Sequence, residues 1–482
     1  MGNVPVQSNM EPLRASNWNG ARPVNRREFL RYAALSTGAL ATGGSILASG
    51  CEGSPTLPEP STRNRLRLPA ELGAHCDLVA SSSAALELGD GRLAPAWGYN
   101  HAVPGPTVRV RRGESVDILL RNSLPQETTV HWHGLVVPHD MDGHPLDAVW
   151  PGGTYAYRYP IVQRAGMHWY HPHPHHHTGE QVFRGLAGAL IIEDEEEGAL
   201  GLPSGPRELP LILRDAELDG SGGLRYRHRR SGVQGDFPLV NGVPYASYDS
   251  DAALYRLRVL NGTNARVFRL ALSTGEPLVV IGNDGGLLEA SAQATRIDLG
   301  PAERLDLLLD LRRAEPERRL ALRCLRAGWD LLEFVITGPG RDADGRIPQQ
   351  LATIPSLSTA DVGAERDFSF EGHSRINGRE YDMHRVDFQV PLGETELWRF
   401  RSDGSAPHPI HVHGTHFQVI SRSGGRGRVF PWERGWKDTV LLQDGETVEV
   451  LTRFERYKGL YLLHCHKLEH EEAGMMLNFE VT

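Results

Sequence analysis

The chain has 482 residues, of which 40% are hydrophobic, and its formal net charge is -9 at pH 7. This hydrophobic content permits buried cores, and an acidic balance without a basic patch argues against nucleic acid as a partner. A generic soluble surface is the simplest explanation of the charge, and it suits a protein that meets small molecules.

The first 51 residues contain a segment that is typical of an export signal. Asn25-Arg26-Arg27-Glu28-Phe29-Leu30-Arg31 precedes a mildly apolar stretch at 32–49, as in a twin-arginine signal, which exports folded proteins. A short anchor helix at the membrane surface is the alternative. We therefore expect an exported protein in the periplasm or another extracytoplasmic space.

Cys51 and the residues after it bear on how the protein is held there. The sequence up to Cys51 resembles a lipoprotein cleavage box, with Ala48 where leucine is usual, so lipidation and its absence both stay open. Residues 52–64 are rich in Pro, Ser and Glu and would form a flexible linker.

Beyond the linker, the pattern is typical of β-sandwiches. Long helical periods are few, and Gly, Pro, Asn and Asp separate strand-like runs at 115–120, 255–260, 304–309 and 447–454. The remaining length of about 415 residues suits three domains of ordinary size. We expect an all-β fold with domains at 65–198, 199–342 and 343–482.

Four His-x-His pairs are the most distinctive feature of the chain: His131/His133, His171/His173, His411/His413 and His464/His466. Chance would give roughly one such pair at this histidine content. On a strand, residues two apart point to the same face, so each pair would present both imidazoles to one partner surface. Cys465 would then point to the opposite face, and its strand could serve two metal sites.

The pairs belong to an internal repeat. Equal spacings of 17 and 19 residues lead into the pairs of both end domains (Glu114 to His131 and Glu394 to His411; Gly152 to His171 and Gly445 to His464). Each end domain would therefore supply four imidazoles. When Asn261 is aligned with Asn122, Leu270 and Leu272 stand at the ligand positions, so the middle domain is expected to hold no metal there.

A second ligand set involves His408, Cys465, His470 and Met475. A thiolate with two imidazoles and a weak axial methionine is the ligand set of a blue-copper electron-transfer centre. Met475, beside Met476, would pass for a core residue on its own, but its place ten residues after Cys465 favours a ligand.

With these motifs the chain resembles the multicopper oxidases. His131-Trp132-His133-Gly134, His171-Pro172-His173, His408-Pro409-Ile410-His411-Val412-His413-Gly414 and His464-Cys465-His466, with His470 and Met475, match the four copper motifs of that family. The likeness spans about residues 65–482 and is greatest to the bacterial three-domain laccase and cuprous-oxidase branch. It implies a Greek-key cupredoxin fold in each domain.

The resemblance also implies four copper ions and a ligand for each. His131 and His411 would bind a type 2 copper, and His408, Cys465 and His470, with Met475 as the axial ligand, a type 1 copper. The type 3 pair would take the other six: His133, His171, His173, His413, His464 and His466.

The implied reaction is the one-electron oxidation of phenols or aromatic amines coupled to four-electron reduction of oxygen to water, by a monomer. One alternative is an oxidase of Cu(I) or another metal ion; only seven methionines argue against a dedicated cuprous site. Another is a copper-binding or cell-division scaffold without turnover. Asp142 and Glu471 resemble the acids that supply protons to the cluster, although a turn aspartate and a solvated glutamate are the ordinary alternatives.

Three further features stay open from the sequence. Cys76 and Cys324 would form either one disulfide or two separate buried thiols. The run His175-His176-His177 would either capture extra metal or be solvated. Asp438, in Trp436-Lys437-Asp438, matches a common third-domain element, for which we expect a structural role.

Overall fold

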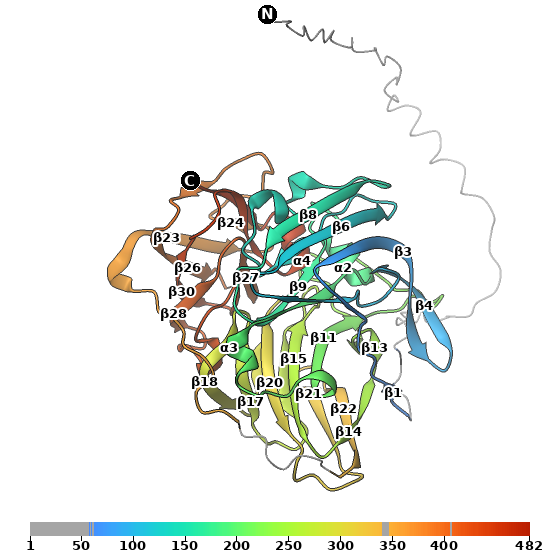
Figure 1. Cartoon of the computed structure of the whole chain (residues 1–482). Helices are drawn as coiled ribbons and strands as arrows, with labels where there is room; N and C mark the ends of the chain where they lie inside the picture. Colours follow the sequence, from blue (N-terminus) through green and yellow to red (C-terminus); the bar gives the residue numbers. More distant parts are fainter. Residues whose placement is uncertain (1–56, 58, 60–61, 340–346, 405–406) are drawn as a thin grey trace, which may run out of the picture. The chain divides into compact units, whose positions relative to one another are not determined.

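The computed structural model describes residues 57, 59, 62–339, 347–404 and 407–482 (Figure 1). The expected export segment at 1–51, with Cys51, lies outside the described residues. Within the described part of the chain, none of the helices has the length and apolar character needed to cross a membrane.

In the described residues, six sheets form three pairs, which we call the first, middle and third sheet pairs. The first pair contains a four-stranded and a five-stranded sheet, in the orders β4 (Arg92–Tyr99), β3 (His75–Gly89), β6 (Ser115–Ser123), β8 (Thr154–Pro160), and β2 (Glu71–Leu72), β5 (Thr107–Arg111), β10 (Gly188–Glu193), β9 (Gly166–His171), β7 (His131–His133).

The middle pair is the largest. Its six-stranded sheet has the order β1 (Asn64–Arg65), β14 (Ala246–Asp251), β22 (Trp329–Gly338), β21 (Arg319–Cys324), β16 (Phe268–Leu272), β19 (Ile297–Leu299). Its seven-stranded sheet has the order β13 (Val243–Pro244), β12 (Phe237–Val240), β11 (Glu208–Ala216), β15 (Leu254–Asn261), β20 (Arg304–Asp310), β17 (Leu278–Asn283), β18 (Gly286–Ala294).

The third pair has two five-stranded sheets: β24 (Arg375–Ile376), β23 (Val362–Glu371), β26 (Thr395–Ser402), β30 (Glu446–Arg453), β28 (Phe417–Gly424), and β25 (Phe388–Val390), β32 (Met476–Val481), β31 (Gly459–Cys465), β27 (His408–Val412), β29 (Thr439–Leu442). The helices are short: α2 (Thr178–Arg184), α3 (Glu195–Gly198), α4 (Leu468–Glu472), and the 3-10 turns η1 (His139–Met141), η2 (Pro145–Asp147), η3 (Gly205–Arg207), η4 (Thr359–Asp361) and η5 (Pro431–Glu433).

The all-β prediction is therefore confirmed. The four strand-like runs correspond to β6, β15, β20 and β30, the last of which begins and ends one residue earlier than expected. Along β6, Val116, Ile118 and Leu120 are buried while their neighbours are more exposed, because alternate side chains of this strand face the core. The domain boundaries stay a prediction.

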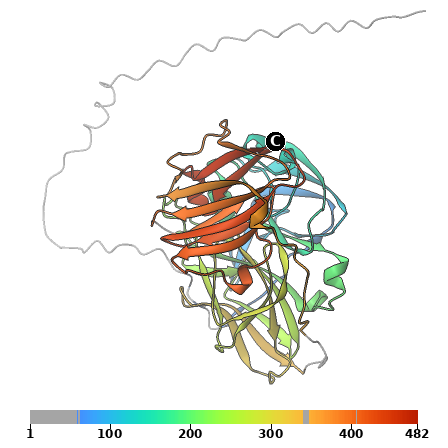
Figure 2. The ribbon, with the colours of Figure 1, turned by 90° about the vertical axis from the view of Figure 1, so that its left-hand side faces the viewer.

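Each sheet pair encloses its own apolar core, and Figure 2 shows the orange-to-red strands of the third pair beside the blue-to-teal strands of the first. Trp132 is fully buried in the first core, so alternation turns His131 and His133 away from that core. In the third core, Ile410 and Val412 have the same effect on the histidines beside them.

The strand register completes this placement. His131 lies opposite His171 in the β7–β9 ladder, and His411 lies opposite His464 in the β27–β31 ladder. Directly opposite residues of an antiparallel pair lie close together on one face. The first and third sheet pairs therefore each contribute a cross-strand histidine pair on the face away from their own core.

The positions of Cys76 and Cys324 decide between one disulfide and two separate thiols. Cys76 packs against the first core and Cys324 is buried in the middle core, and both are free thiols. The disulfide reading is therefore wrong, because the two side chains belong to separate cores. Burial raises the pKa of the Cys76 thiol to about 11. Leu270 and Leu272, at the middle positions that correspond to ligands, are also part of the middle core.

Candidate metal centre

Two groups of metal-ligating side chains gather in the described part of the chain. The larger, which we call the imidazole cluster, combines four histidines from the first sheet pair with four from the third: His131, His133, His171, His173, His411, His413, His464 and His466. Each of the eight is at most 1% exposed. The predicted convergence of the end domains is thus present in the geometry.

Imidazole nitrogens face each other inside this cluster. Nε2 to Nε2 distances are 3.3 Å for His131 to His411, 3.4 Å for His171 to His466, and 3.0 Å for His413 to His464. His173 Nε2 also lies 3.4 Å from His464 Nε2. Each of these contacts except the one between His413 and His464 joins the first sheet pair to the third.

The outer nitrogens fix the tautomers of several rings. His131 Nδ1 donates to the carbonyl of Asp142 and His411 Nδ1 donates to the carbonyl of Asp438, both at 2.8 Å. A carbonyl oxygen can only accept, so Nδ1 of each ring carries the proton and Nε2 keeps a lone pair. The lone pairs of His131 and His411 then point at each other across 3.3 Å.

Two opposed lone pairs in a dry interior repel each other unless a cation lies between them. Burial also lowers the pKa of His171, His411 and His413 well below the usual value, and that of His466 to about 3, so these rings are neutral. Neutral imidazole is the form that binds metal ions. The residues present therefore fit a cluster of imidazole-bound metal ions.

His133 differs from the other rings. Its Nε2 lies 3.1 Å from Asp438 Oδ1 and 3.0 Å from Thr439 Oγ1, whereas its buried Nδ1 has no hydrogen-bond partner among the described residues. Arg304 Nη1 donates to Asp438 Oδ1 at 2.7 Å, and its Nη2 contacts Oδ2. His133 is therefore held by Nε2 and offers Nδ1 to the cluster.

Asp142 and Glu471 both touch the cluster from outside. Asp142 Oδ2 accepts a hydrogen bond from His413 Nδ1 at 2.7 Å, and Glu471 Oε2 lies 3.1 Å from His464 Nδ1. Asp142 is fully buried and Glu471 is 2% exposed, so neither is an ordinary solvated surface acid. Burial alone would raise the pKa of Glu471, but His173 and His464 outweigh it and lower that pKa to about 2.

The smaller group, which we call the thiol site, lies in the third core. Cys465 Sγ is 3.5 Å from His408 Nδ1 and 3.7 Å from His470 Nδ1, and the two Nδ1 atoms are 3.3 Å apart. The three atoms form a small triangle of one sulfur and two nitrogens, which suits a copper ion. Met475 is fully buried in the same core, and its carbonyl accepts from the amide of Cys465 at 3.1 Å.

Two short pieces of chain link the groups. β31 ends at Cys465, whose side chain turns to the thiol site while His464 and His466 reach the imidazole cluster. In α4, His470 belongs to the thiol site and the next residue, Glu471, contacts the imidazole cluster. The two groups are thus joined covalently through adjacent residues.

Sequence reasoning missed the middle domain's contribution. Arg304 lies on β20 and is 1% exposed, and besides Asp438 it contacts the carbonyl of Asp284 at 3.0 Å. The only sequence signal was a positively charged residue at the start of a strand, β20, whose other residues are leucines and two aspartates. Asp438, expected to be structural, contacts a cluster histidine directly.

In the histidine run at 175–177, the ring of His175 packs against His176 and Tyr381, which do not belong to the imidazole cluster. His175 lies 3.7 Å from the ring centre of His176 and 5.2 Å from that of Tyr381, and burial lowers its pKa to about 4. His177 precedes the first residue of α2. Capture of extra metal by this run stays a prediction.

Comparisons with known proteins agree with this geometry. Two family models described as multicopper oxidase match residues 82–197 and 348–482. The multicopper oxidase mco of Staphylococcus epidermidis is 34% identical over 80% of this chain and 83% of its own length, and the laccase of Bacillus subtilis is 31% identical over 80% and 90%. The crystal structure of a laccase from Pediococcus acidilactici has a TM-score of 0.83 at 33% identity, covering 88% of this chain and 94% of that one.

Proposed function

Because the chain belongs to the multicopper oxidase family and is an oxidoreductase that uses oxygen, we propose that it acts as a laccase on phenols and aromatic amines. Such reductants give one electron at a time, whereas oxygen needs four electrons to become water. The observation that carries the proposal is the meeting of eight imidazoles from both end domains beside a separate thiol site. This arrangement suits an enzyme that collects electrons at one place and uses them at another.

The chain would hold four copper ions, which supply one-electron redox chemistry and the binding and reduction of oxygen. His408, Cys465 and His470 would hold the type 1 copper, with Met475 as a further, weaker ligand, and His131 and His411 would hold the type 2 copper. Two sets of three would hold the type 3 pair: His133, His171 and His466, and His173, His413 and His464. Support comes from the short nitrogen-to-nitrogen distances that join His131 to His411, His171 to His466, and His464 to both His413 and His173.

Protons would be handled by the two buried acids. Asp142 Oδ1 is buried, has no hydrogen-bond partner among the described residues and lies 3.4 Å from His131 Nδ1, which places a carboxylate oxygen for proton transfer beside this ring. Glu471 would do the same between His464 and His173, at 3.1 and 3.6 Å. Both acids lie within reach of the cluster edge, which general acid catalysis requires.

Electrons would cross between the two sites along the chain itself. Cys465 lies between His464 and His466 in sequence, so a path of covalent bonds leads from its sulfur to either imidazole. The third core around the sulfur is apolar and closed, which keeps water away from this path. Separation of the reductant from the oxygen-reducing cluster prevents release of partly reduced oxygen.

Oxygen uptake by the copper-loaded protein tests the proposal. We expect uptake with 2,6-dimethoxyphenol, and none by Cys465→Ser, which removes the thiolate but no imidazole. Uptake with Cu(I) but not with the phenol would replace the laccase proposal with a metal oxidase. No uptake with either would favour a copper-binding or cell-division scaffold.

We also propose that the protein is exported through the segment at 1–51 and works as a monomer. Support for export is the Arg26-Arg27 pair before an apolar stretch. Replacement of both arginines by lysine should retain the protein in the cytoplasm, and mass analysis of the exported chain would show whether Cys51 carries a lipid.

A further inference from the structure

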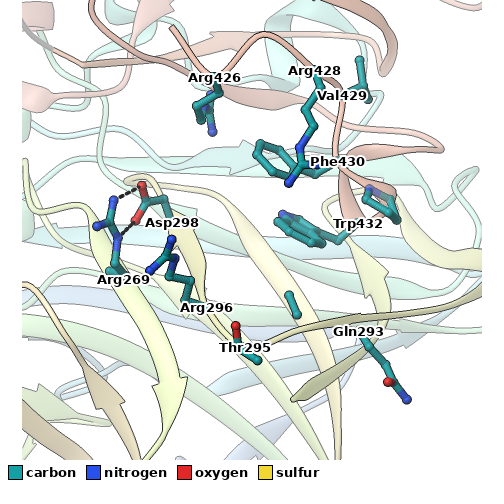
Figure 3. Close-up of a pocket in the computed structure, with 12 residues that line it drawn as sticks. Arg269, Gln293, Thr295, Arg296, Asp298, Arg426, Arg428, Val429, Phe430 and Trp432 are labelled. Atoms are coloured by element: carbon teal, nitrogen blue, oxygen red, sulfur yellow. Dashed lines mark hydrogen bonds and ion pairs between the residues drawn. The ribbon is translucent and has the colours of Figure 1, made fainter. Parts of the chain in front are cut away.

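A cavity of about 790 Å³ lies between the middle and third sheet pairs (Figure 3). Residues around β18 and β19 form one wall, and the segment at 426–432 forms the other. None of its lining residues belongs to the imidazole cluster or the thiol site. The volume lies within the range of small-molecule sites in proteins.

Positive charge dominates the lining. The lining residues include four arginines and a single carboxylate, that of Asp298. Arg269 donates two hydrogen bonds to this carboxylate, at 2.7 and 2.9 Å. Arg426 is likewise engaged, by Glu446 at 2.9 and 3.0 Å. Arg296 and Arg428 are exposed, and neither forms an ion pair with a carboxylate of the described residues. Within the part of the chain that the structure describes, two guanidinium groups in this cavity thus lack a carboxylate partner.

An aromatic surface lies beside Arg428. The rings of Phe430 and Trp432 are stacked, with centroids 4.8 Å apart and planes 18° apart. The guanidinium of Arg428 lies 4.9 Å from the centre of the Phe430 ring. Figure 3 shows Trp432 and Phe430 side by side at the cavity, with Arg296 reaching in from the opposite wall. Trp432 also packs against the middle core, which fixes its position.

We propose that this cavity binds a small planar aromatic anion, a ring that carries a carboxylate or sulfonate group. Arg296 and Arg428 would engage the acidic group, because guanidinium forks match planar oxyanions. Trp432 would stack on the ring, a contact that favours flat, polarisable ligands. The site is separate from the copper ligands and does not depend on the proposed oxidase activity.

Equilibrium dialysis of the copper-loaded protein with 2-naphthalenesulfonate tests the proposal. We expect one molecule bound per chain, and binding at least about tenfold weaker in Arg296→Gln/Arg428→Gln, which removes two charge-assisted contacts. Arg65→Gln/Arg92→Gln is the matched control, because it lowers the net charge equally at exposed positions outside the cavity. This control should bind the probe as the unmodified protein does.

Displacement of the bound probe from the unmodified protein by other ligands is a second test, which needs no variant. Inorganic sulfate and uncharged 2-naphthalenemethanol should each displace the probe only at concentrations at least about tenfold higher than its own, since each lacks half of the recognition. Equal competition by sulfate would overturn the aromatic part of the proposal, and equal competition by the alcohol would overturn the anionic part. If both double variants bound 2-naphthalenesulfonate equally weakly, overall charge would explain the effect, and the proposed site would be overturned.

Discussion

Asp438 Oδ1 lies 3.1 Å from Nε2 of His133, a histidine that comes from the other end of the chain. The carbonyl of the same aspartate accepts from His411 Nδ1 at 2.8 Å, and Arg304 of the middle sheet pair donates to its carboxylate at 2.7 Å. One residue therefore orients an imidazole from each end domain, and the middle domain holds that residue in place. Burial would raise the pKa of Asp438, but Arg304 keeps it well below its usual range.

Replacement of Asp438 by asparagine should loosen the imidazole cluster and spare the thiol site. The side-chain shape is kept, but the charge that holds both His133 Nε2 and Arg304 is lost. We expect turnover or cluster copper affinity to fall by about 10–100-fold, as for other groups that orient metal-binding histidines. Copper titration followed by electron paramagnetic resonance would separate loss at the cluster from loss at the thiol site.

The exposed Asp249→Asn is the matched control for this variant, since it removes one negative charge from β14 far from the cluster in sequence. It should leave copper affinity and turnover unchanged. An Asp438→Asn protein that binds copper and turns over like the unmodified enzyme would show that His133 needs no such partner.

Replacement of Arg304 by methionine should lower the free energy of unfolding of the protein. It leaves the carboxylate of Asp438 buried without its guanidinium, whereas Asp284 keeps Lys437 Nζ at 2.7 Å. Removal of one member of a buried ion pair costs about 3–5 kcal/mol. Denaturant unfolding of the copper-free protein measures the cost. The double variant Arg304→Met/Asp438→Asn should recover part of the lost free energy of unfolding. A loss below about 1 kcal/mol in the single variant would contradict a stabilising ion pair between Arg304 and Asp438.

Asp142→Asn and Glu471→Gln should each slow turnover while copper content stays full. Both keep the shape of a fully buried side chain but cannot carry a proton to the cluster, and general acid catalysis is worth about 100-fold or more. Steady-state oxygen uptake at saturating oxygen is the measurement. Asp140→Asn, an exposed neighbour on η1, should turn over normally, and unchanged rates in the two buried variants would remove their proton-transfer role.

Asp147 provides a test of pH-dependent stability outside the metal ligands. Partial burial raises the pKa of its carboxyl to about 6 from an unfolded value near 3.8, so the fold favours the protonated form. This contribution to stability is complete below the unfolded pKa and is lost as the pH rises through about 6. Asp147→Asn should therefore match the unmodified protein at pH ~4 and melt at a higher temperature at pH ~7.5. Thermal unfolding of both proteins at both pH values checks the sign. A variant that melts at a lower temperature than the unmodified protein at pH ~7.5 would refute it.

Much of the candidate site could be predicted from the sequence, because strand alternation is a local rule. Trp132 between two histidines, and Cys465 between two more, already indicate which side chains share a face. Leu270 and Leu272 are likewise two residues apart on β16, and both face the middle core.

What the sequence could not supply depends on contacts between distant segments. Which nitrogen of His133 faces the cluster is decided by Asp438, 305 residues away, and by the position of Arg304 in another sheet pair. Whether Cys76 and Cys324 pair depends on which cores enclose them, and spacing carries no information about that. Local periodicity predicts faces of strands, and only the packed sheets show which faces meet.

We propose above all that the two end domains share one copper cluster, connected to a fourth copper by Cys465. A crystal structure of the copper-loaded protein, with anomalous scattering recorded at the copper absorption edge, tests it most directly. We predict three copper peaks among the eight imidazoles and one peak between His408, Cys465 and His470. Copper bound separately by each end domain, or none among the facing imidazoles, would contradict the account.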